Sequence, residues 1–114
     1  MDDFADLTFP VDAALGEGIR VKLNSDGELV AAGATDAAYI GWTKRETFAA
    51  GDLVAITSRG REVVVKAAAA ITAYVALYSD ASGAVNDSAP ENSVLVGVAL
   101  EAASSGARFR AMVW

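Results

Sequence analysis

The chain has 114 residues, carries a net charge of −6, and contains neither cysteine nor histidine. This length fits one domain, and the missing residue types exclude disulfides, Cys/His zinc sites and histidine-based catalytic triads. The acidic balance argues against nucleic acid and anionic membranes as partners, because phosphate contacts need a basic patch, and the longest apolar run, residues 67–78, is too short to span a bilayer.

The first twelve residues differ from the rest of the chain. They combine acidic and large apolar residues with one breaker: Asp2, Asp3, Phe4, Asp6, Leu7, Phe9, Pro10 and Asp12. No helical periodicity persists here, so we expect residues 1–12 to form an extended, flexible arm that orders on contact with a partner. A frayed terminus without a role is the alternative.

After Gly18 the pattern is that of β-strands. Ile19, Val21 and Leu23 alternate with polar residues, and a second alternation at residues 108–113 closes the chain, which predicts half-buried strands. Further strands are expected at residues 29–32, 39–42, 53–57, 63–65, 74–78 and 94–99, with a hairpin turn at residues 58–61. Residues 43–49 and 67–70 are the places for a short helical turn. We therefore expect an all-β fold, a small antiparallel β-barrel or β-sandwich with at most one or two short helical turns.

The two halves of the chain resemble each other weakly. Residues 21–26 align with residues 75–80 at an offset of 54 positions, and Gly41 aligns with Gly97 at an offset of 56. This pattern predicts a single β domain over residues 13–114 with a weak internal two-fold repeat, about residues 19–60 and 74–114, whose units pack with pseudo-twofold symmetry. Chance reuse of the same turn residues is the alternative.

Few residues are suited to catalysis. Asp26 and Asp80 each follow a serine in a predicted turn, where aspartate accepts backbone N–H bonds. A pair of carboxylates can serve a glycosidase, but a turn is the simpler interpretation, and no calcium-loop spacing is present. We predict no catalytic, cofactor-binding or metal-binding residues, and hence no enzyme. Trp42 and Trp114, the largest side chains, are expected to be packing anchors or subunit contacts.

Several segments resemble the small capsid decoration, or cement, proteins of tailed bacteriophages, of the lambda-like head decoration type. They are Tyr-Ile-Gly-Trp at 39–42, residues 48–54, 69–73 and 77–80, and the most family-like stretch, Val-Gly-Val-Ala-Leu-Glu-Ala-Ala at 96–103. The resemblance implies a compact, β-tulip-like domain without enzymatic activity. Such proteins bind the outside of the expanded head and stabilise it against internal DNA pressure.

The resemblance also implies partners and a location. The partner is the major capsid protein, and the protein itself is expected to be a homotrimer, with a dimer or a monomer as other states. It is expected on the outer capsid surface of the virion after synthesis in the host cytoplasm. On this view Trp42 and Trp114 lie at the subunit interface, and the arm binds the capsid by adding a strand to it, through Asp2, Asp3, Phe4, Asp6, Leu7 and Phe9. Deleting residues 1–12 is then expected to leave the fold intact.

A different binding module is the alternative function. A β-sandwich that serves as a surface adhesion or carbohydrate-binding domain needs exposed aromatic rings on which sugars stack. Tyr39, Trp42 and Tyr78 are the candidates for that platform.

Overall fold

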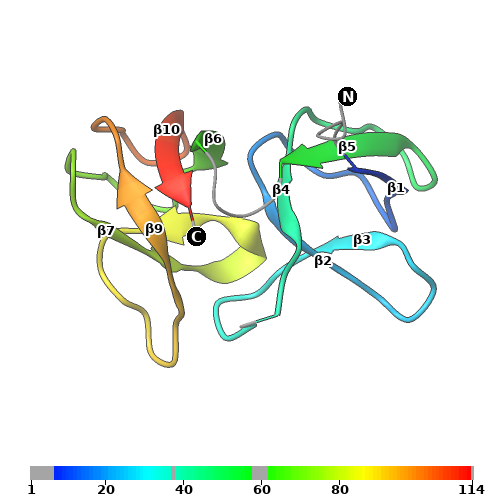
Figure 1. Cartoon of the computed structure of the whole chain (residues 1–114), viewed down its shortest axis with the longest axis horizontal. Helices are drawn as coiled ribbons and strands as arrows, with labels where there is room; N and C mark the ends of the chain where they lie inside the picture. The colour runs from blue at the N-terminus through cyan, green and yellow to red at the C-terminus, as the bar shows by residue number, and fades with distance from the viewer. Residues whose placement is uncertain (1–6, 37, 58–61, 114) are drawn as a thin grey trace.

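The structure, a computed structural model, describes residues 7–36, 38–57 and 62–113. Within these residues, ten strands form two antiparallel five-stranded sheets, and one 3₁₀ turn, η1 (Ala81–Gly83), is the only helical element. Figure 1 shows the two sheets side by side along the long axis of the molecule. The all-β expectation is confirmed. No described helix has the length and apolar character needed to cross a membrane.

The two sheets have the same strand order. The first sheet has the order β1-β5-β4-β2-β3 and contains β1 (Leu7–Pro10), β2 (Arg20–Leu23), β3 (Leu29–Ala31), β4 (Gly41–Thr43) and β5 (Leu53–Thr57). The second sheet has the order β6-β10-β9-β7-β8 and contains β6 (Glu62–Lys66), β7 (Ala76–Ser79), β8 (Val85–Asn86), β9 (Leu95–Ala99) and β10 (Arg108–Val113). We call residues 7–57 the first unit and residues 62–113 the second unit.

Strand register defines which positions of the two units are equivalent. Val21 pairs with Gly41 in the first unit, and Leu77 pairs with Gly97 in the second. The equivalent of Val21 is therefore Leu77, at an offset of 56 positions, and not Val75 as the sequence alignment at offset 54 suggests. A displacement of two positions leaves every side chain on the same face of a strand, so the alternation of apolar residues does not reveal it.

Each unit curls until its two edge strands meet at one point. Val11, just after β1, bridges to Leu29 of β3, and Ala67, just after β6, bridges to Val85 of β8. Both sheets are otherwise open. The fold is therefore intermediate between the barrel and the sandwich that the strand pattern predicts.

The core is built from small side chains and closely spaced backbones. One apolar cluster lies inside the first unit, around Val21 and Ile56. The other lies inside the second unit, but it also contains Tyr39 and Trp42 of the first unit. A second unit poor in large side chains thus obtains bulk from its neighbour. The strands are also closely spaced at Gly97, where a Cβ would collide with the carbonyl oxygen of Met112, so less side-chain volume is needed to fill the core there.

The folded domain begins earlier in the chain than residue 13. Leu7–Pro10 form β1, and Val11 is completely buried. The alternation of Leu7, Phe9 and Val11 is the signal for this strand. The predicted arm therefore contains a strand of the first sheet, and residues 1–6 lie outside the described residues.

Two smaller expectations also differ from the structure. Residues 58–61 lie outside the described residues, but the strands on either side, β5 and β6, belong to different sheets and are not two arms of a hairpin. The helical turn forms at Ala81–Gly83 and not at residues 43–49 or 67–70. Asp80 precedes this turn and accepts a bond from the N–H of Ala81.

Candidate functional site

β1 is an open edge of the first sheet. It pairs on one side with β5, Leu7 opposite Ile56 and Pro10 opposite Leu53, and no described strand pairs with its other side. The N–H of Val11 donates to the carbonyl of Asp52, so by alternation the backbone nitrogen of Pro10 lies on the open side. Proline has no N–H there, which restricts strand addition to the beginning of β1.

Two of the six predicted capsid-binding residues lie on β1. Phe9 packs against the apolar cluster of the first unit, whereas Leu7 is largely exposed. Asp2, Asp3, Phe4 and Asp6 lie outside the described residues. The chain therefore enters the domain through an edge strand with one anchored and one exposed apolar side chain.

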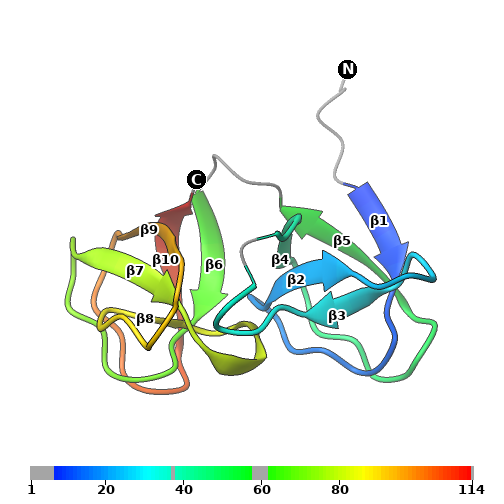
Figure 2. The same ribbon diagram turned by 90° about the horizontal axis from the view of Figure 1, so that it is seen from below.

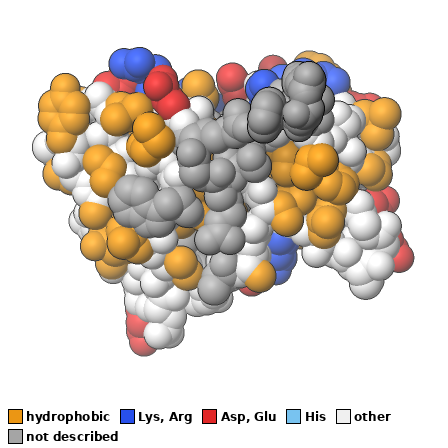
Figure 3. Space-filling view, viewed as in Figure 1, with side chains coloured by type: hydrophobic (Ala, Val, Ile, Leu, Met, Phe, Trp, Pro, Cys, Tyr) orange, Lys and Arg blue, Asp and Glu red, His pale blue; other side chains and the backbone are white. Residues whose placement is uncertain are grey.

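Four strand ends meet on one face of the molecule. Figure 2 shows that β1 and β6 begin on this face and that β5 and β10 end on it. Figure 3 views the same face directly, and hydrophobic side chains lie on both sides of the undescribed atoms. The face on which β1 begins is therefore partly apolar.

Trp42 is fully buried inside the chain, and Tyr39 nearly so. Their rings pack edge to face with centroids 5.1 Å apart. A side chain without exposed surface does not contact a second subunit or a sugar, so this placement disagrees with the expectation of Trp42 at a subunit interface. It also removes the platform of Tyr39, Trp42 and Tyr78, because two of its three rings lie in the core. Trp114 lies outside the described residues.

Arg20 is the buried charge at the contact between the two units, although the alternation of β2 predicts that it points to solvent. Its guanidinium donates to the carbonyls of Gly33 (2.6 Å) and Asp36 (2.8 Å) and lies 4.8 Å from the ring centroid of Tyr39. Burial lowers the pKa of Arg20 from its ordinary value. Its Nε atom and the Nε1 atom of Trp42 are buried without a hydrogen-bond partner among the described residues. Arg20 thus holds the loop after β3 and packs the contact between the units.

The carboxylate of Asp36 completes this loop. It accepts bonds from Lys22 (2.8 Å) and from the N–H of Gly33 (2.7 Å). Both bonds hold the pKa of Asp36 below its ordinary value, and the bond from Lys22 has the larger effect. Its contacts assign Asp36 a structural role.

Asp26 and Asp80 lie in different units and serve local structure. Asp26 is exposed in the turn between β2 and β3, where its N–H donates to Asn24 Oδ1. Asp80 accepts bonds from the N–H of Ala81 (2.6 Å) and from the side chain of Asn86 (3.0 Å). The structure does not bring the two together as a catalytic pair. In the part of the chain that the structure describes, no three metal-ligating side chains form a group.

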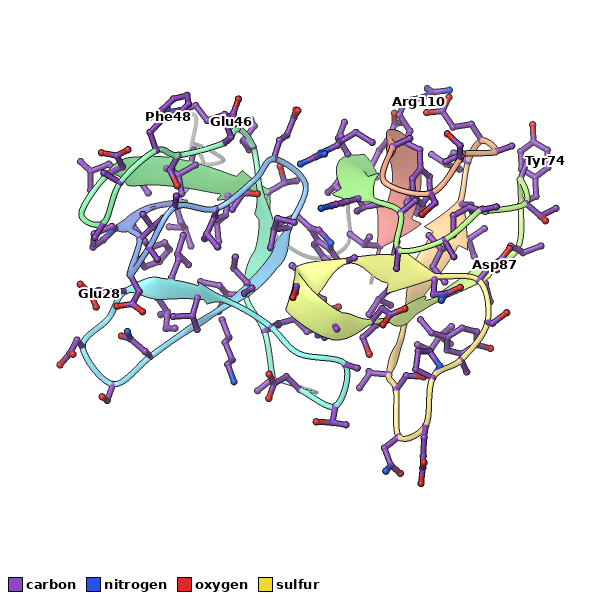
Figure 4. All side chains as sticks on the ribbon, turned by 180° about the vertical axis from the view of Figure 1, so that it is seen from behind. Glu28, Glu46, Phe48, Tyr74, Asp87 and Arg110 are labelled. Atoms are coloured by element: carbon purple, nitrogen blue, oxygen red, sulfur yellow. The ribbon has the colours of Figure 1, made fainter. Side chains whose placement is uncertain are left out.

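A shallow hollow of about 580 Å³ lies between the units. It is lined by Glu17, Arg45, Glu46, Phe48 and Arg108. Arg108 Nε donates to the carbonyl of Glu17 across the contact between the units (3.0 Å), and Figure 4 shows Phe48 and Glu46 at the same corner of the molecule. Two acidic and two basic side chains balance one another, so the hollow lacks the single-sign charge that a small ionic ligand requires.

The chain is similar to proteins of phage heads. A family model described as phage cement protein matches residues 7–113. Among solved structures, the head fiber gp8.5 N base of bacteriophage phi29 has a TM-score of 0.74 at 17% sequence identity, with 96% of this chain and 93% of that chain covered. At this identity the likeness shows a shared fold alone. No curated protein sequence matches the chain.

Proposed function

Because the chain belongs to the phage cement protein family, we propose that it binds the outside of an expanded phage head and stabilises the shell against the pressure of packaged DNA. The observation that carries the proposal is the family match over residues 7–113, which spans both units. The resemblance seen in the sequence is thereby confirmed, and a capsid decoration role follows from the family. The protein acts by binding and not by catalysis.

The N-terminal segment is the proposed attachment to the major capsid protein. Residues 1–6 precede β1 directly, and the open side of β1 offers backbone groups for strand addition. Phe4 and Leu7 would fill apolar pockets of the capsid, and Asp2, Asp3 and Asp6 would meet basic groups. Phe9 would hold the segment on the domain, because it packs into the first unit.

A homotrimer on the outer surface of the virion is the proposed working form. Joining several copies turns later binding events into intramolecular ones, so modest contacts of each arm sum to tight binding. The protein would be made in the host cytoplasm and join the shell after expansion.

Co-sedimentation with expanded and unexpanded shells tests this function. We expect saturable binding near one copy per capsid subunit on expanded, undecorated shells and little binding to unexpanded ones. Absence of binding to both shells would contradict the proposal.

A chain that lacks residues 1–6 tests the attachment. This variant keeps β1, so it should fold normally and bind expanded shells weakly. Removal of residues 1–12 is unsuitable, because it deletes β1 and the buried Val11. A full chain with Asp26, Glu28 and Glu91 neutralised is the matched charge control, and its binding should be unchanged. Equal binding by the truncated and complete chains would refute the role of the segment.

A further inference from the structure

Two different surfaces meet where the units contact each other. The first unit contributes Gly18, whose carbonyl accepts a bond from the N–H of Lys66 in β6 (3.0 Å), and Arg20, whose carbonyl would lie 2.7 Å from a Cβ at Gly83 of η1. The second unit contributes β6 and η1 to this contact. Their equivalents in the first unit, β1 and the turn that contains Gly27, make none of these contacts. The units therefore pack head to tail and not with the pseudo-twofold symmetry expected from the repeat.

A head-to-tail contact leaves one copy of each surface unused. The second unit carries the equivalents of Gly18, Arg20, Tyr39 and Trp42, and the first unit carries the equivalents of Val63, Ser79, Gly83 and Arg108. We call the first set the β7–β9 patch and the second set the β1–β5 patch. By strand register and matching backbone bonds, the β7–β9 patch contains Tyr74, Ala76 and Val98, and the β1–β5 patch is Leu7, Leu23, Gly27 and Leu53. Leu95 completes the β7–β9 patch as the equivalent of Tyr39, because it precedes Gly97 by two positions as Tyr39 precedes Gly41.

Both unused patches are apolar although they face solvent in the single chain. Tyr74 is 77% and Leu95 45% exposed on one patch, and Leu7 is 58% and Leu53 57% exposed on the other. With Leu23, these are five of the eight large hydrophobic side chains that are exposed among the described residues. Such concentration indicates surfaces that are covered in the working protein.

The contact inside the chain shows how such a patch is covered. Val63 is buried in the cluster that contains Trp42, whereas its equivalent, Leu7, is exposed. A Cβ at Gly83 would collide with the side chain of Ile19, whereas a Cβ at the equivalent Gly27 would have nothing within 4 Å. The β1–β5 patch therefore lacks the neighbour that covers its counterpart.

The two patches lie at opposite ends of the molecule. β1 and β3 are at one end and β7 at the other (Figure 1), and Figure 4 shows Glu28, which follows Gly27, and Tyr74 at opposite ends. One chain cannot bring its own patches together, but two copies can.

We propose that the β7–β9 patch of one chain docks on the β1–β5 patch of a second copy, so that the contact inside the chain continues from chain to chain. The new contact is not an identical copy. A Cβ added at Gly18 would lie 2.9 Å from the carbonyl oxygen of Val64, so the equivalent Tyr74 cannot approach a partner strand as closely as Gly18 does. Pro10, the equivalent of Lys66, also lacks the N–H that Lys66 donates to Gly18. The contact between chains is therefore wider and made by side chains, with the ring of Tyr74 against the leucines of the partner.

This inference specifies the interface of the proposed oligomer, and it is independent of capsid binding. The two proposals can therefore fail separately: the oligomer is measured with the purified chain alone, and capsid binding with shells.

Light scattering coupled to size exclusion tests the contact with the full chain and two variants, Leu95→Glu on the β7–β9 patch and Leu53→Glu on the β1–β5 patch. We expect an oligomer for the wild type and a single-chain mass for each variant. Burial of an unpaired carboxylate should weaken association by about 100-fold or more. Both positions are exposed in the single chain, so circular dichroism should show an intact fold.

Mixing the two variants tests the head-to-tail arrangement itself. Each variant keeps the patch that the other has lost, so an equimolar mixture should form a one-to-one dimer and nothing larger. Met112→Glu is the matched control, because Met112 is exposed on β10 and belongs to neither patch, and it should remain oligomeric. Should either glutamate variant unfold, Tyr74→Asp and Leu7→Asp replace them. A monomeric wild type, variants that stay oligomeric, or a mixture that stays monomeric would each overturn the proposal.

Discussion

The first and second units share strand order and, apart from a register shift between Leu77 and Tyr78, strand register, yet equivalent side chains have very different surroundings. Trp42 is completely buried, whereas its equivalent Val98 is half-buried. Leu7 is exposed, whereas its equivalent Val63 is buried. Strand geometry alone therefore does not determine burial in this molecule. The neighbour that each unit packs against determines it, and each unit has a neighbour on one side only.

The difference also shows where large side chains are placed. Arg20, Tyr39 and Trp42 gather on the one surface of the first unit that the second unit covers. The equivalent surface of the second unit carries the smaller Ala76, Leu95 and Val98 side chains. Substitutions at equivalent positions therefore separate two contributions to the free energy of unfolding, that of the fold within a unit and that of the contact between units.

Trp42→Ala should give the largest difference between equivalent positions. Removal of this buried ring leaves a cavity in the core of the second unit, and a loss of about 3–5 kcal/mol in the free energy of unfolding is expected. Val98→Ala, at the equivalent half-buried position, should cost less than about 1 kcal/mol. Denaturant unfolding of both variants in the Leu95→Glu background measures the two without a contribution from association. Similar losses of unfolding free energy in the two variants would show that the equivalent positions do not differ in burial as the structure indicates.

Gly83→Ala and Gly27→Ala form the second pair. Both glycines have a positive φ, 77° and 78°, so alanine should cost each about 1–2 kcal/mol. Only at Gly83 would the added Cβ also meet the backbone of Arg20, which should add about 1–3 kcal/mol. Thermal or denaturant unfolding should therefore rank Gly83→Ala as the more destabilising change, and equal effects would contradict the packing of η1 against β2.

Acid should act on the first unit through Asp36 and Asp52. Lys22 lowers the pKa of Asp36, and the N–H groups of Phe48 and Ala49 lower that of Asp52. Because the pKa of each is lower in the folded than in the unfolded chain, their stabilisation is present above a pH of about 4 and is lost as the pH falls through the folded pKa. The double variant Asp36→Asn, Asp52→Asn should flatten the stability profile between neutral pH and pH 3. If the dependence of stability on pH were the same in the double variant, these two carboxylates would not be its source.

Alternation of apolar residues predicts strands well where one face of the strand is buried. β5 falls where it was expected, and β10 buries Phe109, Ala111 and Val113 as the pattern predicts. β8, with two residues, is too short for a periodic signal. β1 carries the same alternation, but acidic residues and a proline around it favour the interpretation as an arm.

The burial of Arg20 could not be predicted from its strand. Alternation places Arg20 opposite Ile19 and Val21, on the side that faces water when a sheet has one neighbour. The second unit covers that side, and this long-range contact leaves no local trace in the sequence. The same reason explains why Trp42 was expected at a subunit interface: a large aromatic residue indicates a contact, but not whether the neighbour is the same chain.

The central position of β10 has a consequence for the synthesis of the protein. Among the described strands β10 is the last to leave the ribosome, and it lies between β6 and β9 in the second sheet. Until it is made, β6 has no strand partner among the described strands, and its pairing must then close a long loop, which is slow. A polypeptide that ends before Arg108 therefore cannot assemble its second unit, and the finished domain forms only after β10 has been synthesised.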